Sequence, residues 1–118
     1  MIDELMDEAF RMFEKAEMRI DNEISESIDL FRQGVGKLLN TYLIIKGFQG
    51  KDGGDLKELF EECNRINPDF EIIQSEIEYL TEVSPTGVDG EELIDKSNEI
   101  WDFIEGLLTE NELADDTF

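Results

Sequence analysis

The stretch from Ser27 to Gly47 constrains the fold of this chain most strongly. Its apolar residues recur at steps of three and four, which indicates one face of an α-helix. That face comprises Ile28, Phe31, Val35, Leu38, Leu39, Tyr42 and Ile45, and Leu30, Leu43 and Ile44 widen it until little of the circumference is polar. Such a helix needs neighbours on more than one side, so we expect it at the centre of a helical domain.

A first helix is predicted before the central one. Its apolar face comprises Ile2, Leu5, Met6, Ala9, Phe13, Ala16, Ile20 and Ile24, broadened by Phe10 and Met12. Neither Gly nor Pro separates the two helices, yet a compact domain needs the chain to turn back. We place the break at Asn22 to Ser27, with Ser25 or Ser27 as the next N-cap.

Three further helices follow the glycine-rich connection from Gly47 to Asp55, whose glycines can stop a helix in the left-handed conformation. The first is short, from about Asp55 to Ile66, with Asp55 as its cap. Asn67 and Pro68 begin the next, which Ser84 to Gly87 ends. Asp89, with Glu92 three positions later, begins the last. The buried positions predicted on these helices are Leu56, Leu59, Phe60, Cys63, Phe70, Ile73, Ile77, Leu80, Leu93, Ser97, Ile100, Ile104 and Leu107, with Ile94, Trp101 and Leu108 as a second row on the last helix.

The pattern predicts an all-α protein: an up-and-down bundle of four long helices plus one short helix. Residues 1–109 are expected to form one domain, and residues 110–118 an acidic, frayed tail. A chain of 118 residues has room for one core. We expect part of the wide apolar stripe on the central or last helix to be exposed in the monomer and buried between two subunits, because one small core rarely hides such helices.

The chain is strongly acidic, with 31 Asp and Glu against 10 Lys and Arg and a net charge of −21. The imbalance lies mainly in residues 68–118, where Lys96 is the one base. Such a surface repels phosphate, so direct binding of nucleic acid or of anionic lipid is not expected. Residues 1–4 lack a signal-peptide pattern, and no apolar run is long enough to span a membrane. We therefore expect a cytoplasmic protein.

Histidine is absent from the chain, which excludes catalytic triads, Cys-His dyads and metal sites that use histidine. Two carboxylate pairs, Glu78 with Glu82 and Glu91 with Asp95, have the spacing to share a cation, but solvated helix faces explain them better. We predict no catalytic residue, no metal ligand and no cofactor. Lone Cys63 is expected to be a buried thiol.

The aromatic residues and the glycine-rich loop are the remaining candidates for a ligand site. Trp101, Phe103, Phe10, Phe13 and Tyr42 could form a cage, but their helical spacing favours core packing. The loop lacks the Gly-Lys-Ser/Thr ending of a phosphate-binding loop and the alternating acids of a calcium loop. It is therefore predicted to be a connector.

Three segments resemble the HEPN domain, a helical fold found in higher eukaryotes and prokaryotes. They are RQGVGKLLNTYLIIKG (Arg32 to Gly47), GGDLKELFEECNRINPDFEIIQSEIEYLTEVSP (Gly53 to Pro85) and ELIDKSNEIWDFIEGLL (Glu92 to Leu108). The resemblance implies a bundle of four or five helices and a homodimer. Family members include metal-independent RNases that use an Arg and a nearby His, and non-catalytic proteins that work beside a nucleotidyltransferase.

This chain departs from the family pattern at functional positions. Gly54 stands where members often have His before Asp-Leu, Gly36 where they often have Glu, and Asn40 where they often have Lys. Residues 83–85 replace an Arg-Tyr-Pro-like end. None of the arginines, Arg11, Arg19, Arg32 and Arg65, can be followed by a catalytic His.

These departures predict a protein without enzymatic activity. We expect it to act by binding a protein, such as a nucleotidyltransferase, in a toxin–antitoxin or related module. Two alternatives stay open. The acidic last two helices could imitate nucleic acid and inhibit a basic partner, or the loop from Gly47 to Asp55 could hold a nucleotide.

Overall fold

The protein, seen in a computed structural model, is all-helical over the residues that the structure describes, which are 2–48 and 55–116, with side chains described for 3–48 and 55–109. Its elements are α1 (Ile2–Met18), α2 (Ile24–Ile45), α3 (Leu56–Ile66), the 3-10 segment η1 (Pro68–Ile73), α4 (Gln74–Glu82) and α5 (Gly90–Asp116). None of these helices is both long and apolar enough to cross a membrane.

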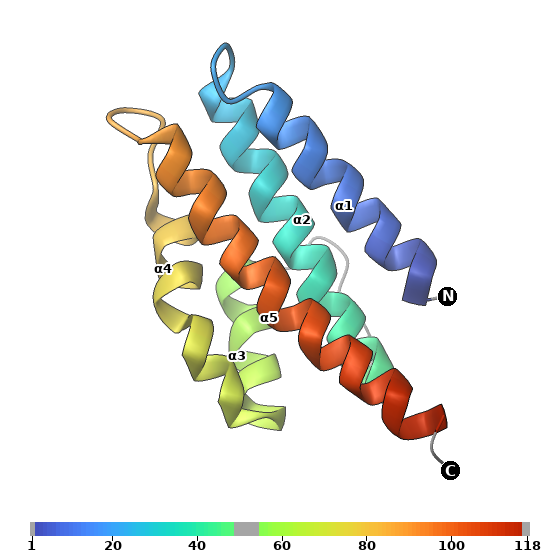
Figure 1. The fold of residues 1–118 in the computed structure, drawn as a ribbon. Helices are drawn as coiled ribbons and strands as arrows, with labels where there is room; N and C mark the ends of the chain where they lie inside the picture. The colour runs from blue at the N-terminus through green and yellow to red at the C-terminus, as the bar shows by residue number, and fades with distance from the viewer. Residues whose placement is uncertain (1, 49–54, 117–118) are drawn as a thin grey trace.

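Helix α2 is the centre of the molecule, as its sequence predicts. Figure 1 shows α1 beside α2 at one edge, α3 and α4 on the other side, and α5 running across the front. Helix α2 packs against each of the other α-helices, whereas α2 is the one described helix that packs closely along α1. The result is elongated, 48 × 25 × 22 Å.

Three of the helices are long, with 17, 22 and 27 residues in α1, α2 and α5. The predicted fourth long helix is not confirmed, because its segment divides into η1 and a nine-residue α4. The backbone of η1 is wound more tightly than an α-helix, and Phe70 and Ile73 are both buried there. The predicted tail, residues 110–118, stays untested because its side chains lie outside the described residues.

The break between the first two helices falls slightly earlier than predicted. Helix α1 ends at Met18, and α2 begins at Ile24 after Glu23, which makes no side-chain cap. The prediction of Ser25 or Ser27 as the N-cap is therefore wrong. Ser27 lies inside α2, fully buried, and its hydroxyl donates a hydrogen bond of 2.7 Å to the Ala16 carbonyl of α1. This hydroxyl therefore joins α2 to α1 in the core and does not cap the start of α2.

The other predicted helix ends are confirmed. Asp55 accepts a hydrogen bond from the Lys57 amide, Asn67 from the Asp69 amide, and Asp89 from the Glu91 amide. At the end of α2, Gly47 has a φ of +88°, which an L side chain rarely adopts. The Gly47 and Phe48 amides donate to the Ile44 and Leu43 carbonyls, as in a Schellman motif.

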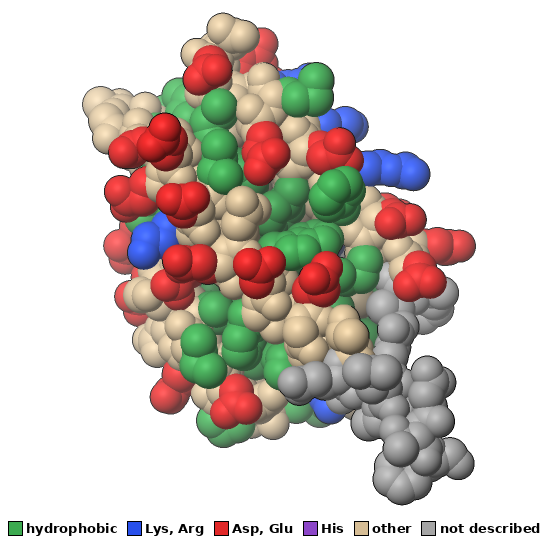
Figure 2. Space-filling model, in the orientation of Figure 1, with side chains coloured by type: hydrophobic (Ala, Val, Ile, Leu, Met, Phe, Trp, Pro, Cys, Tyr) green, Lys and Arg blue, Asp and Glu red, His purple; other side chains and the backbone are tan. Residues whose placement is uncertain are grey.

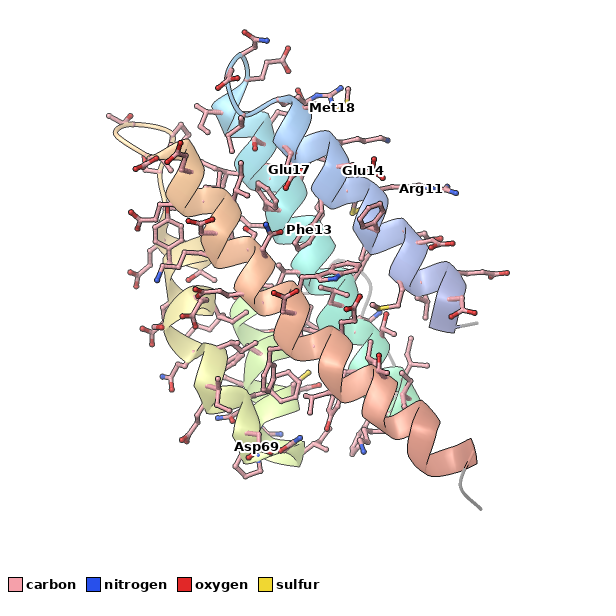
Figure 3. All side chains as sticks on the ribbon, in the orientation of Figure 1. Arg11, Phe13, Glu14, Glu17, Met18 and Asp69 are labelled. Carbon is pink, nitrogen blue, oxygen red and sulfur yellow. The ribbon has the colours of Figure 1, made fainter. Side chains whose placement is uncertain are left out.

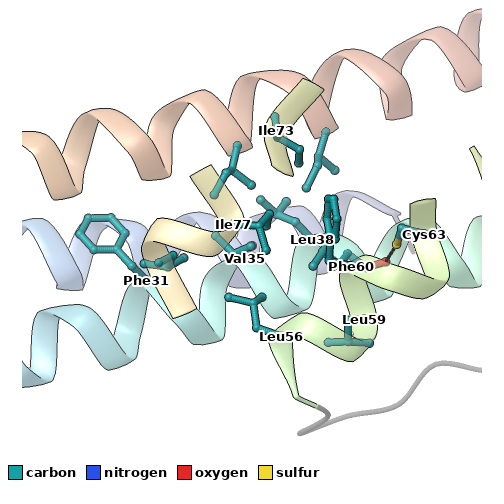
Figure 4. Packing of buried hydrophobic residues seen from close by; sticks show 14 of the residues in the cluster. Phe31, Val35, Leu38, Leu56, Leu59, Phe60, Cys63, Ile73 and Ile77 are labelled. Carbon is teal, nitrogen blue, oxygen red and sulfur yellow. Dashed lines mark hydrogen bonds between the residues drawn. The ribbon is translucent and has the colours of Figure 1, made fainter. Parts of the chain in front are cut away.

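The core is one continuous cluster that draws on every helix (Figure 4). The buried positions predicted for α3, η1 and α4 are all buried, and so is most of the α2 stripe. The large hydrophobic side chains that are exposed in the described part of the chain are Phe10, Met18, Phe48 and Ile72. None of them lies on α2 or α5. The stripe expected to be exposed for a second subunit is thus largely covered by the chain itself.

Two glycines of α2, two positions apart, have different roles. A Cβ at Gly34 would lie 2.7 Å from two ring carbons of Phe13 on α1, so this glycine permits close approach of the two helices. A Cβ at Gly36 would lie 3.8 Å from a methyl carbon of Leu59, an ordinary contact. Close packing therefore requires glycine at position 34 and tolerates it at 36.

Candidate interaction site

Arg32 joins α2 to the end of α4. Its Nε donates to the Leu80 carbonyl at 2.8 Å, and its Nη2 donates to the carbonyls of Thr81 and Val83 at 3.3 and 2.9 Å. The last carbonyls of a helix have no partner within it and carry partial negative charge, so a guanidinium suits them. The sequence did not predict this contact, which spans about fifty positions of the chain. Arg32 therefore has a structural role.

Two of the positions at which the chain departs from the HEPN pattern, Gly36 and Asn40, lie on α2. Asn40 is buried, and Gly36 faces Leu59 of α3. Gly54 lies outside the described residues, as does most of the loop considered for a nucleotide. In the described part of the chain these positions bring no acid, base and nucleophile together.

The carboxylate pairs considered for a cation remain ordinary surface residues. Glu78 accepts a hydrogen bond of 3.2 Å from the Gln74 side chain, and Glu91 and Asp95 are exposed on α5. No group of three or more acidic or cysteine side chains in the described residues could hold a metal ion.

A cavity of about 240 Å³ lies between α3 and α4. Its floor includes Phe60 and Ile77, and its charged groups are Lys57 against Glu61, Glu78 and Glu82. Three carboxylates against one ammonium group repel a phosphate. The cavity is therefore a poor site for a nucleotide.

Cys63 is fully buried on α3, as predicted, and its thiol donates to the Leu39 carbonyl at 3.5 Å. Burial, and secondarily the charge of Glu62, raises the pKa of the Cys63 thiol to about 12. The thiolate is the reactive form of cysteine, so this residue is inert at neutral pH.

The aromatic residues considered as a cage divide into two clusters. The buried cluster is built on Phe70, whose ring centroid lies 4.9 Å from Tyr42, 6.4 Å from Phe60 and 5.3 Å from Phe103. It fills the core between α2, α3, η1 and α5, which confirms the packing interpretation for Tyr42 and Phe103.

The second cluster, which we call the aromatic seam, joins α1 to α5 and consists of Phe10, Phe13 and Trp101. The Trp101 ring lies 5.9 Å from Phe10 and 5.3 Å from Phe13. Phe13 is buried and also packs edge-on against Phe31 of α2, but Phe10 is 51% exposed. The core interpretation is thus right for Phe13 and wrong for Phe10, because α5 does not extend over the outer flank of α1.

The seam is flanked by acidic side chains. The Trp101 indole N–H donates to Glu105 at 3.1 Å. Figure 2 shows hydrophobic side chains gathered between α5 and α1, with acidic side chains along both helices. In Figure 3, Arg11 extends from α1 away from α5. The seam is therefore an apolar strip in an acidic setting.

The sequence contained a signal for this exposure. Phe10 lies one turn from Asp7 and Glu14, both of which are exposed, so it stands at the boundary between the polar and apolar sides of α1. Periodicity alone assigns such a residue to the core face. Its exposure follows from tertiary packing, because α2 is the one described helix that packs closely along α1.

Comparison with known proteins identifies no relative: no protein-family model matches the chain, and no curated protein or solved structure is significantly similar to it.

Proposed function

We propose that this chain is a non-catalytic, HEPN-like helical protein that acts by binding another protein. The observation that carries the proposal is the aromatic seam, in which Phe10 is 51% exposed beside a partly exposed Trp101, because exposed aromatic surface on a small, highly charged protein is typical of interaction surfaces. The HEPN-like bundle and the homodimer belong to this proposal through the sequence resemblance. The cytoplasmic location belongs to it because residues 1–4 lack a signal-peptide pattern and no apolar run is long enough to span a membrane.

The contacts of Arg32 support the proposal that the chain is not an RNase. An arginine that acts on a scissile phosphate needs guanidinium N–H groups that are free to bind it. Arg32, on the helix that carries the best part of the resemblance, uses its Nε and Nη2 to hold α4 carbonyls. The partner we propose is the protein encoded beside this chain, such as a nucleotidyltransferase, as in a toxin–antitoxin module.

The proposal is tested by co-expressing the chain with the product of the neighbouring gene. We expect a complex of defined stoichiometry that survives gel filtration. Purified chain is incubated in parallel with RNA in the presence of EDTA. RNA cleavage that is lost in an Arg11→Gln or Arg65→Gln variant would show that the chain is an enzyme and would overturn the proposal.

The acidic-mimic alternative rests on the concentration of charge in residues 68–118, which hold sixteen acids and Lys96 as their base. Long-range fields of this kind mainly raise association rates and are screened by salt. A mimic should inhibit a nuclease or DNA-binding protein at low salt and release it at moderate salt. A partner that binds equally at both salt levels would exclude this alternative.

Nucleotide binding by the loop from Gly47 to Asp55 is the third candidate function. A bound nucleotide should raise the melting temperature by mass action. The absence of any thermal shift with millimolar nucleotides would exclude nucleotide binding by this loop.

A further inference from the structure

The aromatic seam is an apolar strip that bridges α1 and α5. Figure 1 shows α1 and α5 running side by side in opposite directions on α2. The ring of Phe13 is 5% exposed and lies beneath the strip, while the rings of Phe10, 51% exposed, and Trp101 pack against each other with their centroids 5.9 Å apart. Of the described helices, α2 alone packs closely along α1, so the strip above Phe10 is left open.

The charged neighbours of the seam have one sign. Glu14, Glu17 and Glu105 lie one helical turn after Phe10, Phe13 and Trp101, respectively. None of the residues three or four positions from these aromatic residues is a Lys or Arg. All three glutamates are exposed. A ligand that covers the aromatic rings must therefore bring its positive charges to both edges.

From this geometry we propose that the aromatic seam binds a basic amphipathic helix of a partner protein. The inference rests on the proposed function, protein binding, and adds the chemistry of the partner. An apolar strip shared by two helices can pack against the apolar face of a third, whose anchors recur at steps of three and four residues. Lysine or arginine flanking those anchors would meet Glu14, Glu17 and Glu105.

Charge complementarity favours this partner over a second copy of the chain. A symmetric dimer through the seam would place the glutamates of one copy against those of the other, and each copy carries a net charge of −21. Like charges placed face to face across an interface repel each other and disfavour that partner. A nucleic acid or an anionic membrane meets the same repulsion.

Trp101 is the one tryptophan of the chain and lies in the seam, so its fluorescence reports binding there directly. The full chain is titrated with a helical Leu/Lys peptide of about 18 residues that has one leucine face and no aromatic residue. We expect a saturable blue shift of Trp101 emission that weakens as salt increases. Two control peptides are a Leu/Glu peptide of the same pattern and a Lys/Ser peptide of the same charge, and neither should produce the shift.

The chain offers a matched pair of variants. Phe10 and Phe48 are 51% and 52% exposed, respectively, and Phe48 lies outside the seam, after the end of α2. We expect Phe10→Ala to weaken binding of the Leu/Lys peptide about tenfold, as truncation of an aromatic anchor does, and Phe48→Ala to leave it unchanged. Glu17→Gln, at an exposed position, should weaken binding less than Phe10→Ala does and reduce its salt dependence.

Several results would overturn the inference. One is a shift with the Leu/Glu or Lys/Ser peptide equal to that with the Leu/Lys peptide, or no shift with any of them. Another is an equal loss of binding in Phe10→Ala and Phe48→Ala. A third is a dimer of the chain alone that Phe10→Ala converts to a monomer, because the occupant would then be a second copy.

Failure of this inference is distinguishable from failure of the proposed function. If the co-expressed partner is retained by the Phe10→Ala variant, the seam is not its docking site and protein binding still stands. If the wild-type chain cleaves RNA in EDTA through one of its arginines, the proposed function fails whatever the peptide titration gives.

Discussion

Helix α2 packs in two different ways on its two sides. Against α1 it uses small residues: Gly34 admits the Phe13 ring, and Ser27 bonds to the backbone of the fully buried Ala16. Against α3, η1, α4 and α5 it uses large ones, with the Tyr42 ring against Phe70 at the centre.

The difference explains where the molecule is closed and where it is open. Each buried aromatic side chain removes about 150–250 Å² from water, so the Phe70 cluster holds four elements together on the large-residue side. Small residues let the backbones of α1 and α2 approach closely but leave α1 with a single close neighbour. Its outer flank, with Phe10, stays available for a partner.

Truncation of Phe70 should have the largest effect. Phe70 is fully buried and contacts three other rings, so Phe70→Ala is expected to destabilise the protein by about 3–5 kcal/mol. Phe10→Ala, at the half-exposed residue of the seam, should lower the free energy of unfolding by about 1 kcal/mol or less. Urea unfolding followed by circular dichroism measures both. Equal losses would show that the two clusters do not differ as their burial indicates.

Arg32→Gln should cause the second largest loss of stability. It removes the charge-assisted hydrogen bonds that tie the large-residue side of α2 to the end of α4, with an expected loss of about 2 kcal/mol. Arg11→Gln, at an exposed position on α1, is the control and should change the stability little. An Arg32→Gln variant as stable as wild type in the same urea experiment would show that water replaces the guanidinium without cost.

The two glycines of α2 give a third, smaller and opposite pair of effects. Gly34→Ala should destabilise by about 1–2 kcal/mol, because its Cβ requires the packed Phe13 ring to move. Gly36→Ala should stabilise by about 0.5–1 kcal/mol, because alanine favours the helix and its Cβ meets an ordinary contact. Thermal unfolding measures both. Stabilisation by both variants would show that α1 moves easily and that α1 and α2 are not closely packed.

The smallest expected effect lies in the turn between α1 and α2. The pKa of the Glu23 carboxyl is raised, first by its hydrogen bond with Glu26 and then by the charge of Glu26, against the opposing charge of Arg19. Ionised Glu23 is therefore less favourable in the folded chain than in the unfolded chain. Its cost is present at neutral pH and disappears as the pH falls through the raised pKa toward the ordinary value of 4.5.

Glu23→Gln keeps a hydrogen-bond donor for Glu26 and removes the charge. We expect a small rise in melting temperature at neutral pH that shrinks as the pH is lowered below 4.5. Glu14→Gln, at an exposed position in the middle of α1, is the control. A difference between wild type and Glu23→Gln that does not change with pH would contradict the proposed cause.

Much of the fold was predictable because local rules apply to it. The helix faces of α2, α3 and α4 follow from spacing, and the caps Asp55, Asn67 and Asp89 from short-range hydrogen bonding. The prediction for Ser27 was wrong because a serine suits both a helix start and a buried contact between helices. The division of residues 68–82 into η1 and α4 was not predictable, because both conformations place Phe70 and Ile73 in the core.

The candidate site was predictable only in part. The absence of histidine excluded most catalytic chemistry directly, and the clustering of acids left a basic partner as one open alternative. The seam itself brings together residues about ninety positions apart, Phe10 and Trp101, and no local pattern relates them.

By itself, the sequence determined that the chain is helical, that α2 is central and that the surface is acidic, because periodicity, capping and charge are properties of neighbouring residues. Tertiary structure alone decided which apolar side chain stays uncovered, which arginine holds a helix end and which of two glycines is required. Those outcomes depend on how closely one helix approaches another and where along its length that contact stops.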